Sequence, residues 1–494
     1  MIGLTLAFSP SPPQFSNGGV DAAIDAAVKP IADVVSSVIF FSIQVGDTPV
    51  QLVVVWLMVA ATFFTFYFRF INLRGFTESL RIVTGKRDRE GGPGEVSHFQ
   101  ALTAAVSGTV GVGNVAHVAI AVSIGGPGAA FWLFVAGFLG MSSKFVECTL
   151  GVKYRQQNAD GTVSGGPMFY LDRGLAERGW PRFGKLLARF YALCIILGCL
   201  GVGCMFQSNQ AFVQFVTATG GERSLAVGSG WAFGIGLAVL TALVIIGGIK
   251  SIGRVTAALV PVMALLYIGM ALVVIGAHYE RIPWAIQAIV SQAFSPEGVT
   301  GGAFAVAMLG FRRAAFSNEA GIGSAAIAHS AVRTQKPVTQ GFVALLEPFI
   351  DTMVICMLTA LIIVVAGDPG AHGTGVAAGV EMTSKVVGGV VSWFPSLLTV
   401  VIFLFAYSTL ISWSYYGLAG SVYLFGPGRS VKFTFNLIFC VFVVIGSSAQ
   451  LSSILDFSDS MVFAMAFANI IGLYMLAPVV KRELDEYWSQ RASP

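Results

Sequence analysis

Long apolar runs alternate with short polar or basic segments along most of the chain. Runs of about 20 apolar residues have the length that an α-helix needs to cross a bilayer. A weaker apolar stretch at 31–43 predicts an interfacial or re-entrant helix. The pattern therefore predicts an all-α polytopic membrane protein, with uninterrupted spans at 49–70, 129–152, 186–216, 228–248, 255–277, 342–366, 391–424, 431–445 and 461–480.

Two further apolar runs are interrupted by glycine and polar residues. The first covers 99–124 and contains Ser-Gly-Thr-Val-Gly-Val-Gly-Asn at 107–114. The second begins at about 302 and contains Phe-Ser-Asn-Glu-Ala-Gly-Ile-Gly at 316–323. A broken helix inside a bilayer exposes unpaired backbone groups, so it persists only where it lines a cavity or meets a ligand. Two such segments in corresponding positions indicate the central site of a transporter.

The order of the spans predicts one extra helix followed by two sets of five. Because each set has an odd number of helices, the second must enter the membrane from the opposite side, which makes an inverted repeat. We expect five parts: an extracytoplasmic N-terminal segment with the interfacial helix (1–48), the extra helix with a basic loop (49–98), the first repeat (99–300), the second repeat (301–480) and a tail (481–494).

Charge supports this assignment. Only 11% of the residues are charged, against about 25% in soluble domains, which excludes an ordinary soluble protein. Lysine and arginine concentrate in segments that the topology puts on one side, and cytoplasmic flanks carry this excess. The N-terminus is then outside and the C-terminal tail inside, and the basic residues on the outer side are Lys29, Arg223, Arg281 and Lys385.

Several motifs resemble those of the alanine or glycine:cation symporters, the sodium:alanine symporter family with a LeuT-like fold. They are Phe-Gln-Ala at 99–101, Gly-Val-Gly-Asn at 111–114, Ser-Gly-Gly-Pro-Met-Phe-Tyr at 164–170, Ala-Phe-Ser-Asn-Glu-Ala-Gly-Ile-Gly-Ser-Ala at 315–325 and Ser-Trp-Ser-Tyr-Tyr-Gly at 412–417. The resemblance covers the predicted transport core. It implies import of alanine, glycine or similar small amino acids coupled to sodium, in the bacterial inner membrane.

The resemblance also implies a substrate site at the two breaks. A helix N-terminus offers free N–H groups and a positive dipole to a carboxylate, and the N–H groups of Val112 and Gly113 would take that role. Carbonyls at Thr109 and near Phe316 would accept from the ammonium group. Phe316 and Trp413 would limit side-chain size, although packing aromatics are the simpler reading. The remaining candidates for substrate contact are Gly111, Asn114, Ser317, Asn318 and Gln207.

Sodium prefers hard oxygen ligands. Adjacent hydroxyls at Ser408 and Thr409 meet that need, although such hydroxyls often bond to their own helix. By resemblance, the carbonyls of Ser107, Val110 and Phe405 would complete the site. A second sodium near the substrate carboxylate would use the side chains of Asn114 and Ser317.

Alternatives stay open at this stage. Buried ionisable residues, among them Lys144, Glu147, Glu319, Glu347 and Asp351, are consistent with proton coupling or exchange, or with mutual neutralisation between helices. An ion channel is the competing class, but channels usually repeat filter elements by oligomer symmetry. No hydrolase or metalloprotease motif is present, so we expect no enzyme. The expected partners are an amino acid, sodium and lipid, without nucleic acid or an obligate protein.

Overall fold

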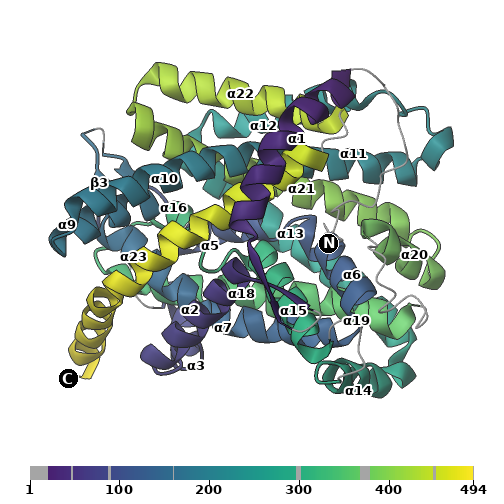
Figure 1. Ribbon diagram of the computed structural model, residues 1–494, viewed down its shortest axis with the longest axis horizontal. Helices are drawn as coiled ribbons and strands as arrows, with labels where there is room; N and C mark the ends of the chain where they lie inside the picture. The colour runs from purple at the N-terminus through teal and green to yellow at the C-terminus, as the bar shows by residue number, and fades with distance from the viewer. Residues whose placement is uncertain are drawn as a thin grey trace.

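The computed structural model describes residues 20–45, 48–86, 91–159, 161–295, 302–367, 379–448 and 452–492, and most of them are helical. Helices far apart in sequence pack side by side into one bundle (Figure 1). By length and composition, seven helices of the described chain can cross a membrane, and one bent pair brings the number to eight. The all-α polytopic fold class predicted from the sequence is confirmed.

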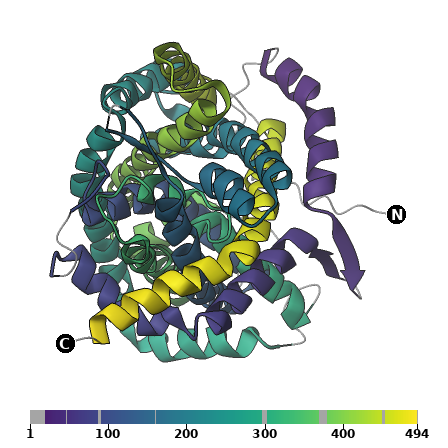
Figure 2. The same ribbon diagram turned by 90° about the vertical axis from the view of Figure 1, so that its left-hand side faces the viewer.

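The N-terminal part precedes the first predicted repeat. Residues 31–39 of the predicted helix belong to a longer helix that ends at Ile39. A β-hairpin follows, so residues 40–43, which were predicted to be helical, are not. Helix α1 lies along α23 at the edge of the bundle (Figure 2). The elements are α1 (Val20–Ile39), β1 (Ser42–Val45), β2 (Thr48–Gln51), α2 (Leu52–Tyr67), α3 (Ile71–Arg74) and α4 (Phe76–Val83).

The first predicted repeat follows the expected order of helices. Its first helix begins with a capping box, in which Ser97 accepts from Gln100 N–H and Gln100 accepts from Ser97 N–H. The helix α14 was not predicted. The elements are α5 (His98–Thr109), α6 (Gly113–Gly125), α7 (Gly128–Lys153), β3 (Gln156–Gln157), β4 (Val163–Ser164), α8 (Pro167–Phe169), η1 (Tyr170–Gly174), α9 (Leu175–Glu177), α10 (Pro181–Leu200), η2 (Gly201–Met205), α11 (Phe206–Ala218), η3 (Gly221–Arg223), α12 (Gly230–Ile245), α13 (Gly248–Ala277), η4 (Tyr279–Arg281) and α14 (Ile282–Gln292).

The second predicted repeat also departs from the prediction in detail. The span expected at 342–366 begins earlier and includes a π-helical segment, and α20 was not predicted. Such π segments occur frequently at functional sites. The elements are α15 (Gly302–Asn318), α16 (Ala325–His329), α17 (Pro337–Ala344), α18 (Leu346–Pro348), η5 (Phe349–Cys356), α19 (Met357–Ala366), α20 (Val380–Val390), α21 (Phe394–Phe425), α22 (Arg429–Ser448) and α23 (Ser452–Ala492).

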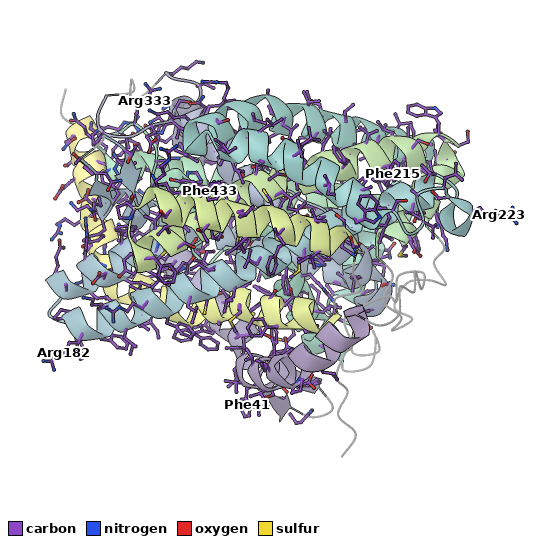
Figure 3. The ribbon with its side chains drawn as sticks, turned by 90° about the horizontal axis from the view of Figure 1, so that it is seen from above. Phe41, Arg182, Phe215, Arg223, Arg333 and Phe433 are labelled. Atoms are coloured by element: carbon purple, nitrogen blue, oxygen red, sulfur yellow. The ribbon has the colours of Figure 1, made fainter. Side chains whose placement is uncertain are left out.

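Labelled charged residues separate along the long dimension of the molecule. Arg182 and Arg333, which the topology puts in the cytoplasm, lie at one end (Figure 3). Arg223, which the topology puts outside, lies at the opposite end (Figure 3). The separation agrees with the predicted sidedness, and the assignment of one end to the cytoplasm remains a prediction.

The chain before α5 and the chain after α16 are joined at one end of the bundle. Val96 and Val332 form a parallel bridge. The guanidinium of Arg155 donates to four backbone carbonyls, and burial lowers the pKa of Arg155 to about 10. At neutral pH it therefore stays charged and keeps all its donors. The carbonyls and their distances are Pro93 (2.6 Å), Ser330 (2.8 Å), Val332 (2.5 Å) and Thr334 (2.7 Å).

Candidate functional site

The first break separates α5 from α6, whose axes differ by 44°. The Gly111 N–H donates to Asn114 Oδ1 at 2.8 Å, and the Asn114 N–H donates to the Gly111 carbonyl at 3.2 Å. Within the described chain, the N–H groups of Val112 and Gly113 have no hydrogen-bond acceptor. Two free N–H groups at the start of a helix are a suitable site for a carboxylate.

Gly111 lies in close contact with two other helices. A Cβ atom at this position would lie 2.7 Å from Thr409 Oγ1 of α21 and 3.5 Å from Gln207 Oε1 of α11, so a larger residue would displace the Thr409 hydroxyl. Gln207 is 5% exposed, and its Oε1 has no hydrogen-bond partner although its Nε2 donates to the Val202 carbonyl at 3.3 Å. A buried acceptor without a donor is costly unless a ligand supplies one. The sequence placed Gln207 among the candidates but could not assign its role.

The candidate sodium ligands come together from α5 and α21. Thr409 Oγ1 lies 3.1 Å from the Ser107 carbonyl and 2.9 Å from the Phe405 carbonyl. Ser408 Oγ lies 3.5 Å from the Ser107 carbonyl and 2.9 Å from the Phe405 carbonyl. Four of the five candidate oxygen ligands therefore form one cluster. Val110, whose carbonyl is the fifth, is buried in the same break.

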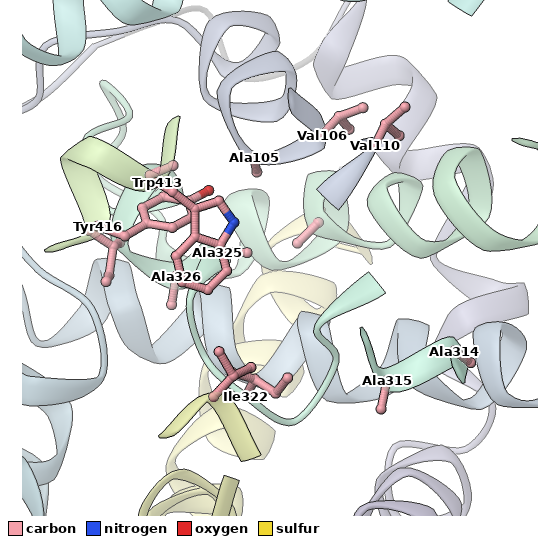
Figure 4. Close-up of a cluster of buried hydrophobic side chains, with 14 of the residues drawn as sticks. Ala105, Val106, Val110, Ala314, Ala315, Ile322, Ala325, Ala326, Trp413 and Tyr416 are labelled. Atoms are coloured by element: carbon pink, nitrogen blue, oxygen red, sulfur yellow. The ribbon is translucent and has the colours of Figure 1, made fainter. Parts of the chain in front are cut away.

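The two candidate aromatic walls lie in different places. The Trp413 indole N–H donates to the Gly108 carbonyl at 3.2 Å. The same side chain packs closely on Gly203, where an added Cβ would lie 2.6 Å from Trp413 Cγ. Figure 4 shows Trp413 and Tyr416 in one buried apolar cluster with residues of α5 and α16. The Phe316 ring instead packs against His117 of α6, with centroids 5.4 Å apart, and against Phe463. Among the described residues no ring contact joins Phe316 to Trp413.

The second break follows α15. The backbone is left-handed at Glu319, Gly321 and Gly323, with φ of 54°, 89° and 93°. Ser317 and Asn318 are the last residues of α15, and both are buried. Asn318 accepts from the Ala320 N–H at 3.0 Å and donates to Thr352 at 3.0 Å, so its polar atoms are used within the protein.

Sequence reasoning placed Asp351 among buried ionisable residues but did not connect it with the breaks. Its Oδ1 accepts from Asn114 Nδ2 at 2.6 Å, and its Oδ2 accepts from Ser317 at 2.7 Å and Thr352 at 2.8 Å. Asp351 thereby contacts residues of both broken helices. Because Asn114 Oδ1 already accepts from Gly111, Asn114 presents its NH₂ group rather than its oxygen to this cluster. Only the fold brings 114, 317 and 351 together, so no local pattern marks the cluster.

The other buried charges are partly neutralised in pairs. Lys144 Nζ lies 2.9 Å from Glu347 Oε1, and His329 Nε2 lies 3.5 Å from Glu347 Oε2. Glu147, three residues from Lys144, instead accepts from Asn469 at 2.9 Å. The Lys144–Glu347 contact agrees with the interpretation that buried charges neutralise each other between helices. A role of these carboxylates in proton movement stays a prediction.

Comparison with known proteins gives the same picture. The profile of the sodium:alanine symporter family matches residues 35–494. The sodium/alanine symporter AgcS of Methanococcus maripaludis is 35% identical over 88% of this chain and 93% of its own length. The probable sodium/glutamine symporter GlnT of Bacillus subtilis is 33% identical over 89% of this chain and 88% of its own length. The crystal structure of MhsT in complex with L-phenylalanine covers 81% of this chain and 100% of that one with a TM-score of 0.55, at 16% identity, which shows the fold alone.

Proposed function

The chain belongs to the sodium:alanine symporter family, and we propose that it carries alanine, glycine or similar small neutral amino acids into the cell together with sodium. The observation that carries the proposal is the convergence on Gly111. The free N–H groups of the break, the hydroxyl of Thr409 and the unpaired oxygen of Gln207 all lie beside this residue. A zwitterion and a cation need this combination of donors and acceptors.

In this proposal the substrate carboxylate binds the N–H groups of Val112 and Gly113. Gln207 Oε1 accepts a hydrogen bond from the substrate ammonium group, and the carbonyls of Thr109 and Phe316 supply further acceptors. The free oxygen of Gln207 supports this assignment, because an ammonium group would satisfy it.

The first sodium binds the carbonyls of Ser107, Val110 and Phe405 and the hydroxyls of Ser408 and Thr409. These hydroxyls now donate to carbonyls. A hydroxyl also has two lone pairs, so it can rotate and coordinate a cation through its oxygen while the carbonyls coordinate the same cation.

A second sodium binds at the Asp351 carboxylate with the hydroxyl of Ser317. Within the described chain, no basic side chain forms a salt bridge with Asp351, which is fully buried. A buried carboxylate without a positive partner is costly, and a bound cation would remove that cost. Asn114 then orients the carboxylate and takes no part as an oxygen ligand.

Uptake into proteoliposomes tests the proposed function. Labelled alanine should accumulate when sodium is higher outside and should not accumulate under an equal potassium gradient. A pH gradient without sodium tests proton coupling, the alternative on the same scaffold. Unlabelled glycine, alanine, leucine and glutamine as competitors rank the substrates. Accumulation driven by the pH gradient alone, or a failure of sodium to drive any uptake, would contradict sodium symport.

A further inference from the structure

Three parts of the protein meet at the side chain of Asn469 in α23. Its Nδ2 donates to the Gly321 carbonyl in the second break at 2.9 Å and to Glu147 Oε1 of α7 at 2.9 Å. Its Oδ1 accepts from the hydroxyl of Tyr170 in η1. Asn469, Glu147 and Tyr170 are all fully buried. Both amide hydrogens and the amide oxygen are therefore engaged.

The backbone of the second break fits closely around this amide. A Cβ at Gly323 would lie 2.9 Å from Asn469 Cγ, and φ at this residue is +93°, so no other residue type fits without strain. The Gly321 carbonyl belongs to no helix, and an unpaired backbone carbonyl in a water-free environment is strongly destabilising. Among the residues that the structure describes, Asn469 supplies the one donor to this carbonyl.

We propose that Asn469 is a positioning residue for transport, which holds the second break in the shape that binds the substrate. This inference rests on the proposed function, because Phe316 and Ser317 immediately precede the break. The hydrogen bond to Gly321 connects the break to α23, and the bond to Glu147 connects the same amide to α7. Loss of these two bonds lets segment 319–324 shift, and the substrate site loses its fit.

Four variants separate the contacts. Asn469→Leu removes both amide donors at similar volume, and Asn469→Asp keeps the shape but donates at most one hydrogen. Glu147→Gln keeps the bond from Asn469 to Gly321 and removes the carboxylate. Tyr170→Phe is the matched control, because it removes only the third hydrogen bond of the amide.

We expect both Asn469 variants to raise the KM for alanine by at least about tenfold, since each loses at least one buried hydrogen bond, with maximal uptake changed less than about twofold. Tyr170→Phe and Glu147→Gln should leave KM within about threefold of the wild type. Hydrogen exchange should become faster at amides 319–324 in the Asn469 variants and stay unchanged at 107–113.

Several results would overturn the inference. One is an unchanged KM in folded Asn469→Asp, and another is a rise of the same size in Tyr170→Phe or Glu147→Gln. Faster exchange spread evenly over all helices would mean that Asn469 serves overall stability. If Asn469→Leu does not fold, Asn469→Asp decides. If the wild type takes up no alanine, the proposed function fails, and the exchange experiment still tests the contact with Gly321.

Discussion

Replacing the hydroxyl of Thr409 tests the first sodium site most directly. The hydroxyl lies 2.9 Å from the Phe405 carbonyl of its own helix and 3.1 Å from the Ser107 carbonyl of α5. The first contact alone would be the common bond of a threonine to its own helix turn. The second contact crosses to the broken helix, and it separates an ion site from simple back-bonding. Thr409→Val keeps the branched shape and removes the oxygen, whereas Thr409→Ser keeps the oxygen.

The two roles of the hydroxyl predict different magnitudes. As a hydrogen bond between helices, it stabilises the folded protein by about 0.5–1.5 kcal/mol. As a ligand of a cation it contributes about 1–3 kcal/mol to binding, which is roughly a five- to 150-fold change in affinity. We expect Thr409→Val to raise the sodium concentration for half-maximal alanine uptake by at least about tenfold. Thr409→Ser should stay within about threefold of the wild type.

The assay is labelled alanine uptake at varied sodium, with thermal unfolding in detergent measured on the same preparations. Ser421→Ala is the matched control, since among the described residues this hydroxyl on the same helix bonds only to the Gly417 carbonyl, at 3.0 Å. It should change neither uptake nor sodium dependence. Unchanged sodium dependence in well-folded Thr409→Val would refute the proposed site and leave back-bonding as the role of Thr409.

Three further predictions concern the substrate. Gly113→Val should fold and reach the membrane, because among the described residues a Cβ there meets only the His117 ring, which has to shift slightly from 3.3 Å. The variant should abolish alanine binding by filling the approach to the free N–H groups; equilibrium binding of labelled alanine measures this, and normal affinity would refute it. Gly111→Ala should weaken both sodium and alanine affinity, since its Cβ would lie 2.7 Å from Thr409 Oγ1; loss of only one affinity would contradict a shared site. Phe316→Ala or Trp413→Ala should let valine and leucine compete with alanine, because each extra buried methylene contributes about 0.8 kcal/mol; an unchanged size limit in active variants would place the selectivity wall elsewhere.

Local sequence was sufficient to find both breaks. Several glycines beside polar residues within an apolar run disfavour a continuous helix, and the structure breaks the chain at 110–112 and 319–324. The sodium candidates depended on the broken helices and on the resemblance, because Ser408 and Thr409 alone favour back-bonding to their own helix. The structure adds the contacts of both hydroxyls with the Ser107 carbonyl.

Contacts between segments far apart in the chain could not be predicted from the sequence. Asp351 and Asn469 acquire their neighbours only when α6, α15, α7 and α23 pack together. The sequence analysis predicted neither π-helical segment, although Asp351 lies in η5 and Gln207 follows η2 by two residues. The prediction that Phe316 and Trp413 both limit side-chain size rested on the resemblance, which does not fix where each ring points.

Coupling between sodium and the amino acid follows from the way one residue serves both proposed sites. Gly111 lies between Thr409 of the proposed ion site and Gln207 of the proposed substrate site. A sodium that turns the hydroxyls of Ser408 and Thr409 would fix the distance between α5 and α21, and the free N–H groups of the break lie only a few residues further along. Because linkage is reciprocal, a sodium ion that raises alanine affinity by some factor must itself bind more tightly by that factor when alanine is present. In this scheme the ion at the first site and the substrate need not touch each other. Symport requires only that both ligands favour the same position of the break between α5 and α6.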